Sequence, residues 1–310
     1  MLKKKRSERL VFSDIMLTLL TLELMSYFYY GIHAVVLAGV CVGCSLMAEI
    51  ISVRLMGRNF KANDLTCISD ALIISLMMPA TANFGIAGVA GVFAVVIAKN
   101  VFGGRFNMIF SPAAAAYVFM LSSWKNELLQ FPKPHVKTGI FETPEKLVDS
   151  ASHIYNVSGK MNYTDFEILL GNFAGATGAV SILLLIVTAV ILIFRKDISA
   201  GAFIGTISGT VIFSLISAVP VKYSLVTNMV LFSAVYIISD RRIAPARNFF
   251  AFFYGFFIAV FSYILVITSA KENAIVLVSV LFTPVLLGFG NLEKKIELAG
   301  TSEKAGDGVE

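Results

Sequence analysis

The sequence predicts an all-α integral membrane protein with about ten transmembrane segments, arranged as two inverted five-segment repeats that contain short or broken helices. Three observations predict this class. The chain is 57% hydrophobic and only 15% charged, with a mean hydropathy of +0.81, whereas a soluble domain would carry about a quarter charged residues. Its apolar residues gather in ten runs. Its basic residues fall mainly on one side of those runs.

The ten apolar runs differ in length. They cover residues 13–30, 34–53, 66–78, 85–101, 109–123, 176–194, 198–219, 224–238, 248–268 and 273–290. The third, fifth and eighth are shorter than the about 20 residues that cross a bilayer as a helix. Irregular backbone persists at membrane depth only where protein encloses it or where it lines a cavity. The short runs therefore indicate a binding site or pathway.

The basic residues test the number of crossings. If all ten runs cross the membrane, 18 of the 25 lysines and arginines fall on the side of the two termini. Five of the remaining seven lie in one long loop, where the positive-inside rule has little force. The lysines and arginines of the short loops and termini therefore divide 18 to 2 between the two sides of the membrane. This split predicts a multi-pass protein of the plasma (inner) membrane with both termini in the cytoplasm.

The chain divides into five regions. Residues 1–12 form a basic cytoplasmic N-terminus, 13–123 a first membrane repeat, 124–165 an extracytoplasmic loop, 166–291 a second repeat and 292–310 a disordered cytoplasmic tail. Both halves place their short run third, with a Ser-Asp pair at its cytoplasmic edge. Because five is odd, the halves are inverted relative to one another, an arrangement typical of transporters.

The two Ser-Asp pairs, Ser69-Asp70 and Ser239-Asp240, are candidate site residues. Ionisable groups at membrane depth are costly and face a cavity or a partner. Asp240 is expected to pair with Arg241 or Arg242. Asp70 has no such neighbour in the sequence, which makes it the stronger candidate for a functional role.

The stretch IAKNVFGG contains Lys99, Gly103 and Gly104, and a further short run opens at Ser111. The two glycines permit positive φ and close approach of the backbone to a ligand. The stretch is either a cradle for a planar or anionic group, or a cytoplasmic loop with a positive-inside lysine. The spacing by itself favours the loop.

A second glycine-rich stretch, GNFAGATG over residues 171–178, precedes the sixth run. Its small residues permit close packing of helices or of a flat ring. Glu23 and Glu49 lie inside the first two runs. Each could bind protons or Na⁺, or could simply be buried beside a polar partner, and the sequence favours neither interpretation. The three cysteines cannot supply the four thiolates of an all-cysteine iron–sulfur cluster.

Four ordered stretches resemble RnfD, a membrane protein of the Rnf electron-transport complex, in the family that it shares with NqrB of the Na⁺-translocating NADH:quinone reductase. The stretches are DLT to LMMPATA (64–82), IAK to FGG and FSPA (97–113), LGNFAG to Ser181 (170–181), and SD to Pro245 (239–245). Together they cover most of residues 13–290.

The resemblance implies a membrane subunit of an ion-translocating electron-transport complex, which is part of an oxidoreductase rather than an enzyme alone. It implies electron relay through flavin, linked to Na⁺ or H⁺ movement. An FMN joined to an outer-loop threonine is expected, with a second, non-covalent flavin or a quinone among the half-helices. The implied partners are other membrane subunits, an FMN-carrying extracytoplasmic subunit, iron–sulfur subunits and membrane lipid, with no nucleic acid.

The sequence departs from the family at the attachment motif. In the best match, residues 149–155, Tyr155 stands in place of the acceptor threonine. Thr177, in the only Gly-Ala-Thr of the region, is the remaining candidate acceptor, and a non-covalent flavin is the alternative. A channel or transporter for a small solute or vitamin is the rival function. The expected cofactor-binding residues are Thr177, Gly175, Gly178, Asn172, Ser69, Asp70, Lys99, Gly103, Gly104, Ser111 and Asp240; no catalytic residue and no metal ligand is expected.

Overall fold

The computed structural model describes residues 8–57, 66–104, 108–137, 139–140, 147–161, 163–269 and 271–284. Each of the ten predicted runs contains an apolar helix. Four helices are long and apolar enough to cross a membrane: Arg9–Tyr30, Ile32–Leu55, Val221–Ile238 and Asn248–Ser269. Six are shorter: Thr66–Met77, Phe84–Asn100, Pro112–Ser123, Ile182–Phe194, Ala200–Ile216 and Ala274–Pro284. An all-α membrane protein is confirmed at this level. The tail from 292 lies outside the described residues.

The first half of the chain surrounds one short helix. Its elements are α1 (Glu8–Tyr30), α2 (Ile32–Leu55), α3 (Thr66–Met77), α4 (Phe84–Phe93), the π-helix η1 (Ala94–Asn100) and α5 (Pro112–Ser123). Helix α3 contacts α1, α2, α4 and α5, and every one of its residues except Ile68 is buried. The most enclosed helix of this half is therefore the short third run.

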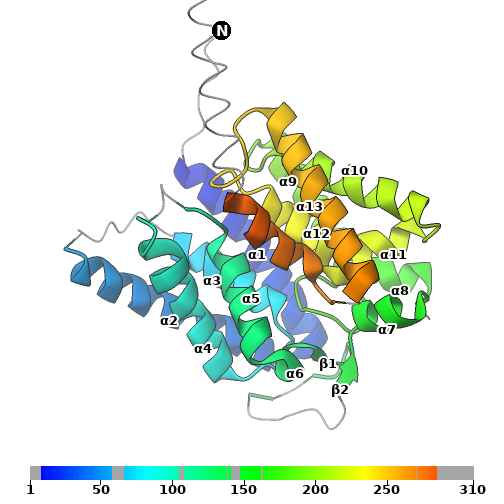
Figure 1. The fold of residues 1–310 in the computed structure, drawn as a ribbon. Helices are drawn as coiled ribbons and strands as arrows, with labels where there is room; N and C mark the ends of the chain where they lie inside the picture. The colour runs from blue at the N-terminus through cyan, green and yellow to red at the C-terminus, as the bar shows by residue number, and fades with distance from the viewer. Residues whose placement is uncertain are drawn as a thin grey trace, which may run out of the picture.

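The long polar loop is folded where it is described. It contains α6 (Lys125–Leu128), the strands β1 (Gln130–Pro132) and β2 (Leu147–Asp149), and α7 (Ala151–Ser158). The strands pair antiparallel, with Phe131 opposite Val148, and add a two-stranded sheet to the otherwise helical fold. Figure 1 places these elements, called the loop end below, opposite the N-terminal end of α1.

The second half contains a helix that is broken within its span. After α8 (Asp165–Leu170) come α9 (Ile182–Phe194), α10 (Ala200–Ile216), α11 (Val221–Val226), the 3₁₀ turn η2 (Thr227–Met229), α12 (Val230–Ser233), the π-helix η3 (Ala234–Ile238) and α13 (Asn248–Ser269). Asn228 and Met229 have positive φ values of 55° and 57°, which right-handed helix excludes. The eighth run is therefore two half-helices joined at these residues.

The sixth run is shorter than its predicted range of 176–194. Helix α9 begins only at Ile182, and residues 172–181 form an irregular crossover. Gly171 caps α8 with φ 85°, in the left-handed region that glycine tolerates best. A Cβ there would overlap the carbonyl oxygen of Val180. Close folding of the crossover onto itself ends α8 and delays α9.

Helices α10 and α13 pack closely through a glycine stripe that the sequence analysis missed. Gly201, Gly205 and Gly209 recur every four residues and so share one face of α10. A Cβ at Gly205 would overlap the backbone carbonyl of Phe252, and one at Gly209 would lie 2.9 Å from the Cβ of Ala259. The small-xxx-small spacing, readable from the sequence, is the usual device for such close packing in membranes.

Candidate functional site

Helix α3 connects the expected site residues at its two ends. It stops at Met77, ahead of Pro79, because proline lacks an N–H and disfavours helix in the residue before it. Asp70 lies near its start and Leu76 near its end, about 9 Å apart along the axis at 1.5 Å per residue. The second half of the chain contacts α3 at both places.

Near its start, Asp70 of α3 is joined to Asp240 by the side chain of Arg242. Arg242 Nη2 lies 2.6 Å from Asp70 Oδ1, and Arg242 Nη1 lies 3.2 Å from Asp70 Oδ2. Arg242 Nε donates to Asp240 Oδ2 at 2.7 Å. The Asp70 side chain is 1% exposed and that of Arg242 14%. The guanidinium also lies 5.8 Å from the Phe12 ring of α1.

This arrangement, the Arg242 bridge (Asp70, Arg242, Asp240), brings the two Ser-Asp pairs together. Asp240 pairs with one of its two expected arginines. The partner of Asp70 comes from 172 residues further along the chain, so no local pattern indicates it. Ser69, by contrast, donates back to the carbonyl of Thr66 in its own helix at 2.9 Å. A bidentate guanidinium holds carboxylates with more geometric specificity than an ammonium.

A second buried ion pair involves Lys99. Its Nζ lies 2.8 Å from Glu49 Oε1, and the two side chains are 1% and 4% exposed. Asn100 donates to Glu49 Oε2 at 3.0 Å and to Ser52 Oγ at 2.6 Å. The interpretation of Lys99 as a solvated loop lysine is wrong. The π-helix η1 lies within the predicted run of residues 85–101 and places consecutive residues, Lys99 and Asn100, against α2.

We expect Lys99→Met to lower the free energy of unfolding by about 3–5 kcal/mol, because removing one partner leaves a buried charge uncompensated. The double variant Lys99→Met with Glu49→Gln should recover most of the loss. Thermal unfolding of the purified protein in detergent measures both. Arg54→Ala, at an exposed position of α2, is the matched control. Equal losses in the single and double variants would contradict the ion-pair account.

The other expected site residues in the first half of the chain lie at helix ends. Gly103 and Gly104 have φ values of 105° and 85°, as the sequence suggests. The Gly104 N–H donates to the Lys99 carbonyl at 3.0 Å, which closes the end of η1. The Ser111 hydroxyl accepts from the N–H of Ala114 and begins α5, with Pro112 in its first turn. These roles satisfy backbone groups that helix ends leave open.

At the far end of α3, the crossover of residues 171–178 satisfies the last carbonyls of the helix. The Gly178 N–H donates to Leu76 O at 2.8 Å, and the Thr177 N–H donates to Met78 O at 3.3 Å. The Thr177 hydroxyl donates to Leu76 O at 3.3 Å. A Cβ at Gly178 would lie 2.6 Å from the Cβ of Leu76, so only glycine fits this contact.

The structure also places the remaining crossover residues and Tyr155 of α7. Thr177 is 4% exposed, and its hydroxyl bonds to the end of α3, so it does not fit as the carrier of a covalent group in this arrangement. Gly175 allows Val180 to approach, and Asn172 donates its backbone N–H to Glu167 O at 2.8 Å. Tyr155, which aligns with the acceptor position of the family motif, is buried with its hydroxyl 3.4 Å from Ser224 Oγ.

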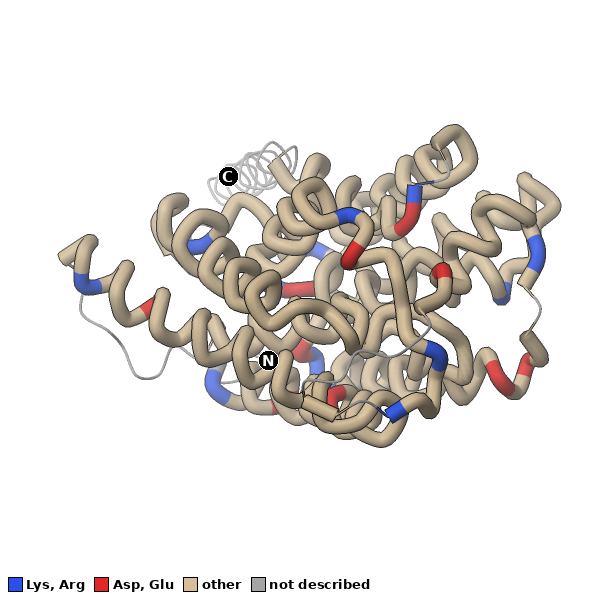
Figure 2. Tube along the Cα trace, turned by 90° about the horizontal axis from the view of Figure 1, so that it is seen from below, with Lys and Arg blue, Asp and Glu red and all other residues tan. Residues whose placement is uncertain are grey.

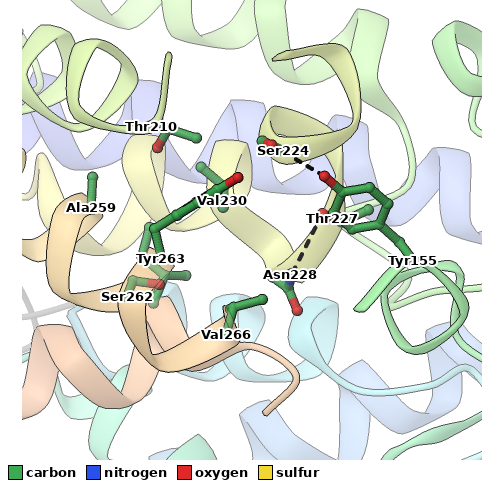
Figure 3. Close-up of a pocket in the computed structure, with 11 residues that line it drawn as sticks. Tyr155, Thr210, Ser224, Thr227, Asn228, Val230, Ala259, Ser262, Tyr263 and Val266 are labelled. Carbon is green, nitrogen blue, oxygen red and sulfur yellow. Dashed lines mark hydrogen bonds between the residues drawn. The ribbon is translucent and has the colours of Figure 1, made fainter. Parts of the chain in front are cut away.

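Figure 3 shows the small cavity beside the break of the eighth run, where the Tyr155–Ser224 contact and the Asn228–Thr227 hydrogen bond lie. Hydroxyl groups of Thr210 and Ser262 also line it. Its volume is about 20 Å³, which is room for about one water molecule. The break is thus lined by hydroxyls and is too narrow for an organic cofactor.

A much larger cavity, of about 400 Å³, opens at the loop end. Ligand pockets typically measure about 300–1,000 Å³, so this one has room for a small organic molecule. Its polar lining consists of Ser122, Lys125, Asn126, Gln130, Asp149, His153, Ser269, Lys271 and Glu272. An apolar wall comes from α5 and from the last helix, with Val118, Leu121 and Leu277.

One side of this cavity is fixed by Glu272. His153 Nδ1 lies 3.2 Å from Glu272 Oε1, and Ser150 donates its hydroxyl to the other carboxylate oxygen. Burial raises the pKa of Glu272, and the contacts with Ser150 and His153 partly oppose this. The contacts tie α7 to the start of the last helix. The cavity wall is therefore pre-formed, with Lys125 and Lys271 left exposed at its opening.

Comparisons with known proteins give one consistent result. Residues 1–289 match the sequence model of the family described as NQR2, RnfD, RnfE. The chain is 25% identical over 249 residues to the D subunit of the Na(+)-translocating ferredoxin:NAD(+) oxidoreductase complex of Acetobacterium woodii, covering 79% of this chain and 76% of the relative. It is 26% identical over 152 residues to the D subunit of the ion-translocating oxidoreductase complex of Shewanella sediminis, covering 48% and 43%.

Proposed function

Because the chain belongs to the NQR2, RnfD, RnfE family, we propose that it is a membrane subunit of an ion-translocating electron-transport complex. It relays electrons through flavin, and this relay is coupled to the movement of Na⁺ or H⁺. The observation that carries the proposal is the family match over nearly the whole chain. Other subunits of the complex are its partners, including iron–sulfur subunits and an FMN-carrying extracytoplasmic subunit.

The topology that we propose has ten crossings in two inverted repeats, in the plasma membrane, with both termini cytoplasmic. One apolar helix in each predicted run supports it. Figure 2 shows long uncharged stretches of chain between the scattered charged residues. Asp70 of the third run and Asp240, just after the eighth run, are joined by Arg242. The loop end is then extracytoplasmic, and the Arg242 bridge lies toward the cytoplasm.

We further propose that flavin binds non-covalently in the cavity of the loop end. The enclosed hydroxyl of Thr177 argues against covalent attachment there. The loop-end cavity, at about 400 Å³, is large enough for a small organic ligand, and its apolar wall suits the ring system of a flavin. Lys125 and Lys271 at the opening suit a phosphate, because ammonium groups bind phosphate oxygens as point charges. A bound flavin supplies reversible uptake of electrons, while the residues of the cavity orient it and limit its exposure to water.

The test is the flavin content of the complex, purified together with its native neighbouring subunits. We expect this chain to have an unmodified intact mass, also when a flavin transferase is co-expressed. We expect the flavin assigned to it to be released on denaturation. The double variant Lys125→Glu, Lys271→Glu should lose that flavin, whereas Lys222→Glu, which changes a lysine outside the cavity, should keep it.

Two outcomes would contradict the proposal. A mass increase of one FMN-phosphoryl unit that disappears in Thr177→Ala would establish covalent attachment at the crossover instead. An assembled complex in which no flavin depends on this chain would favour the transporter reading.

A further inference from the structure

One buried carboxylate at membrane depth takes no part in either ion-paired cluster. Glu23 lies in the second half of α1 and is 8% exposed. Its hydrogen-bond partner is Ser75 of α3, whose Oγ lies 2.7 Å from Glu23 Oε1. Within the described part of the chain, no lysine, arginine or histidine forms an ion pair with it. The other buried membrane glutamate, Glu49, is neutralised by Lys99.

The hydrogen bonds of Ser75 indicate which state of Glu23 the arrangement favours. Ser75 Oγ also lies 2.9 Å from the carbonyl oxygen of Leu72. A serine hydroxyl has one hydrogen to donate, and a carbonyl oxygen has none. If Ser75 donates to Leu72, the contact with Glu23 needs a hydrogen from the carboxyl group. Two full hydrogen bonds therefore form when Glu23 carries a proton, whereas an ionised Glu23 would have to share the one Ser75 hydrogen with the carbonyl of Leu72.

The surroundings of Glu23 supply oxygen atoms but little competing charge. Ser26, one turn further along α1 and on the same side of the helix, is 1% exposed, and its hydroxyl has no hydrogen-bond partner among the described residues. From α2, the thiol of Cys41 lies within electrostatic range of Glu23. From α3 comes Ser75, α9 has no titratable side chain, and Tyr236 of η3 lies near Thr18 of α1. The charged groups that contact α1, Arg195 at Asp14 and Arg242 at Phe12, lie nearer its start.

An ionised carboxylate buried without a cation is strongly unfavourable. We propose that Glu23 is a monovalent-cation site of the membrane domain, which holds a proton in the arrangement described and exchanges it for Na⁺. In the exchange, the O–H bond of the carboxyl breaks, the proton passes to solvent water, and Na⁺ takes its place beside the carboxylate. The oxygen atoms of Ser75 and Ser26 are further ligands of the kind that hard cations prefer. This inference rests on the proposed function, since ion translocation requires such a site.

Carbodiimide labelling of the purified complex tests the proposal, because carbodiimides react with protonated carboxyls in apolar surroundings. Peptide mass spectrometry locates and quantifies the adduct. We expect labelling of Glu23 at mildly acidic pH, a several-fold decrease at alkaline pH, and a similar decrease when Na⁺ replaces K⁺ at equal ionic strength. Glu49, whose carboxylate pairs with the Lys99 ammonium at 2.8 Å, is the internal control and should stay unlabelled. Glu23→Gln should abolish the adduct without loss of thermal stability, since its amide can donate to Ser75.

Changing pH and Na⁺ separately distinguishes the two cations. Labelling that responds to both pH and Na⁺ supports exchange of the two cations, whereas labelling that responds only to pH overturns the Na⁺ part and leaves a proton site. Labelling that responds to neither overturns the proposal, because Glu23 is then a permanently protonated structural group. Infrared difference spectra of wild type and Glu23→Gln report the protonated carboxyl where the reagent has no access, and absence of that band also overturns it. The flavin content of the same preparation tests the proposed electron relay independently, so failure of the Glu23 proposal can be told apart from failure of the proposed function.

Discussion

Arg242→Met is expected to destabilise the protein strongly, because Arg242 joins the start of α3 to the second half of the chain. It removes the cation that holds Asp70 and Asp240, at 2.6 Å from each in the wild type. Two carboxylates then remain buried side by side without compensation. Breaking a buried ion pair in this way costs about 3–5 kcal/mol. Thermal unfolding of the purified protein in detergent should show a correspondingly lower midpoint.

The neighbouring arginine is the matched control for this prediction. Arg241 is exposed, so Arg241→Met should change stability by no more than about 0.5 kcal/mol, as is usual for surface positions. Adding Asp70→Asn and Asp240→Asn to Arg242→Met should restore much of the loss, because the buried charges are then gone. If Arg241→Met and Arg242→Met lower the midpoint equally, the Arg242 bridge does not hold the two halves together.

Gly205→Ala is expected to be the most damaging small substitution in the second half. The added methyl group would lie 2.0 Å from the Phe252 carbonyl oxygen on α13, and neither backbone can yield without separating the two helices. Overpacking of this kind typically costs about 1–3 kcal/mol and occasionally more. The measurement is the yield of monodisperse protein and its unfolding midpoint after purification in detergent.

Gly43→Ala makes the same chemical change where there is space. No atom lies within 4 Å of a Cβ at Gly43, and alanine favours helix over glycine by about 0.5–1 kcal/mol. This variant should be neutral or slightly more stable than the wild type. Equal behaviour of Gly43→Ala and Gly205→Ala would mean that the α10–α13 contact is looser than the structure indicates.

The helices could be predicted from the sequence because apolar runs report burial in lipid or protein directly. The start of α5 at Ser111 and Pro112, and the positive φ of Gly103 and Gly104, follow from local residue chemistry in the same way. The break in the eighth run could not be placed, since Asn228 and Met229 interrupt an otherwise apolar stretch without a proline or glycine. The late start of α9 depends on the close approach of Val180 to Gly171, which the apolar pattern does not indicate.

The sequence singles out the charged residues that the structure pairs, but it does not indicate how they are paired. Asp70, Asp240 and Lys99 were identified because charge is rare in this chain, yet their partners could be found only in three dimensions. Arg242 and Glu49 come from elements far from Asp70 and Lys99 in the sequence, and the π-helix that places Lys99 has no reliable sequence signal. Thr177 was selected by motif, and its role at the end of α3 depends on the fold of the crossover.

The most direct test of the proposed function is ion uptake by inverted membrane vesicles, driven by electron transfer from reduced ferredoxin to NAD⁺, the reaction named for the Acetobacterium woodii relative. Vesicles from cells that lack only this chain should lose both electron transfer and uptake of Na⁺ or H⁺. Both should return when the chain is supplied from a plasmid. Undiminished electron transfer and ion uptake in its absence would contradict the assignment of this chain to the electron-transport complex.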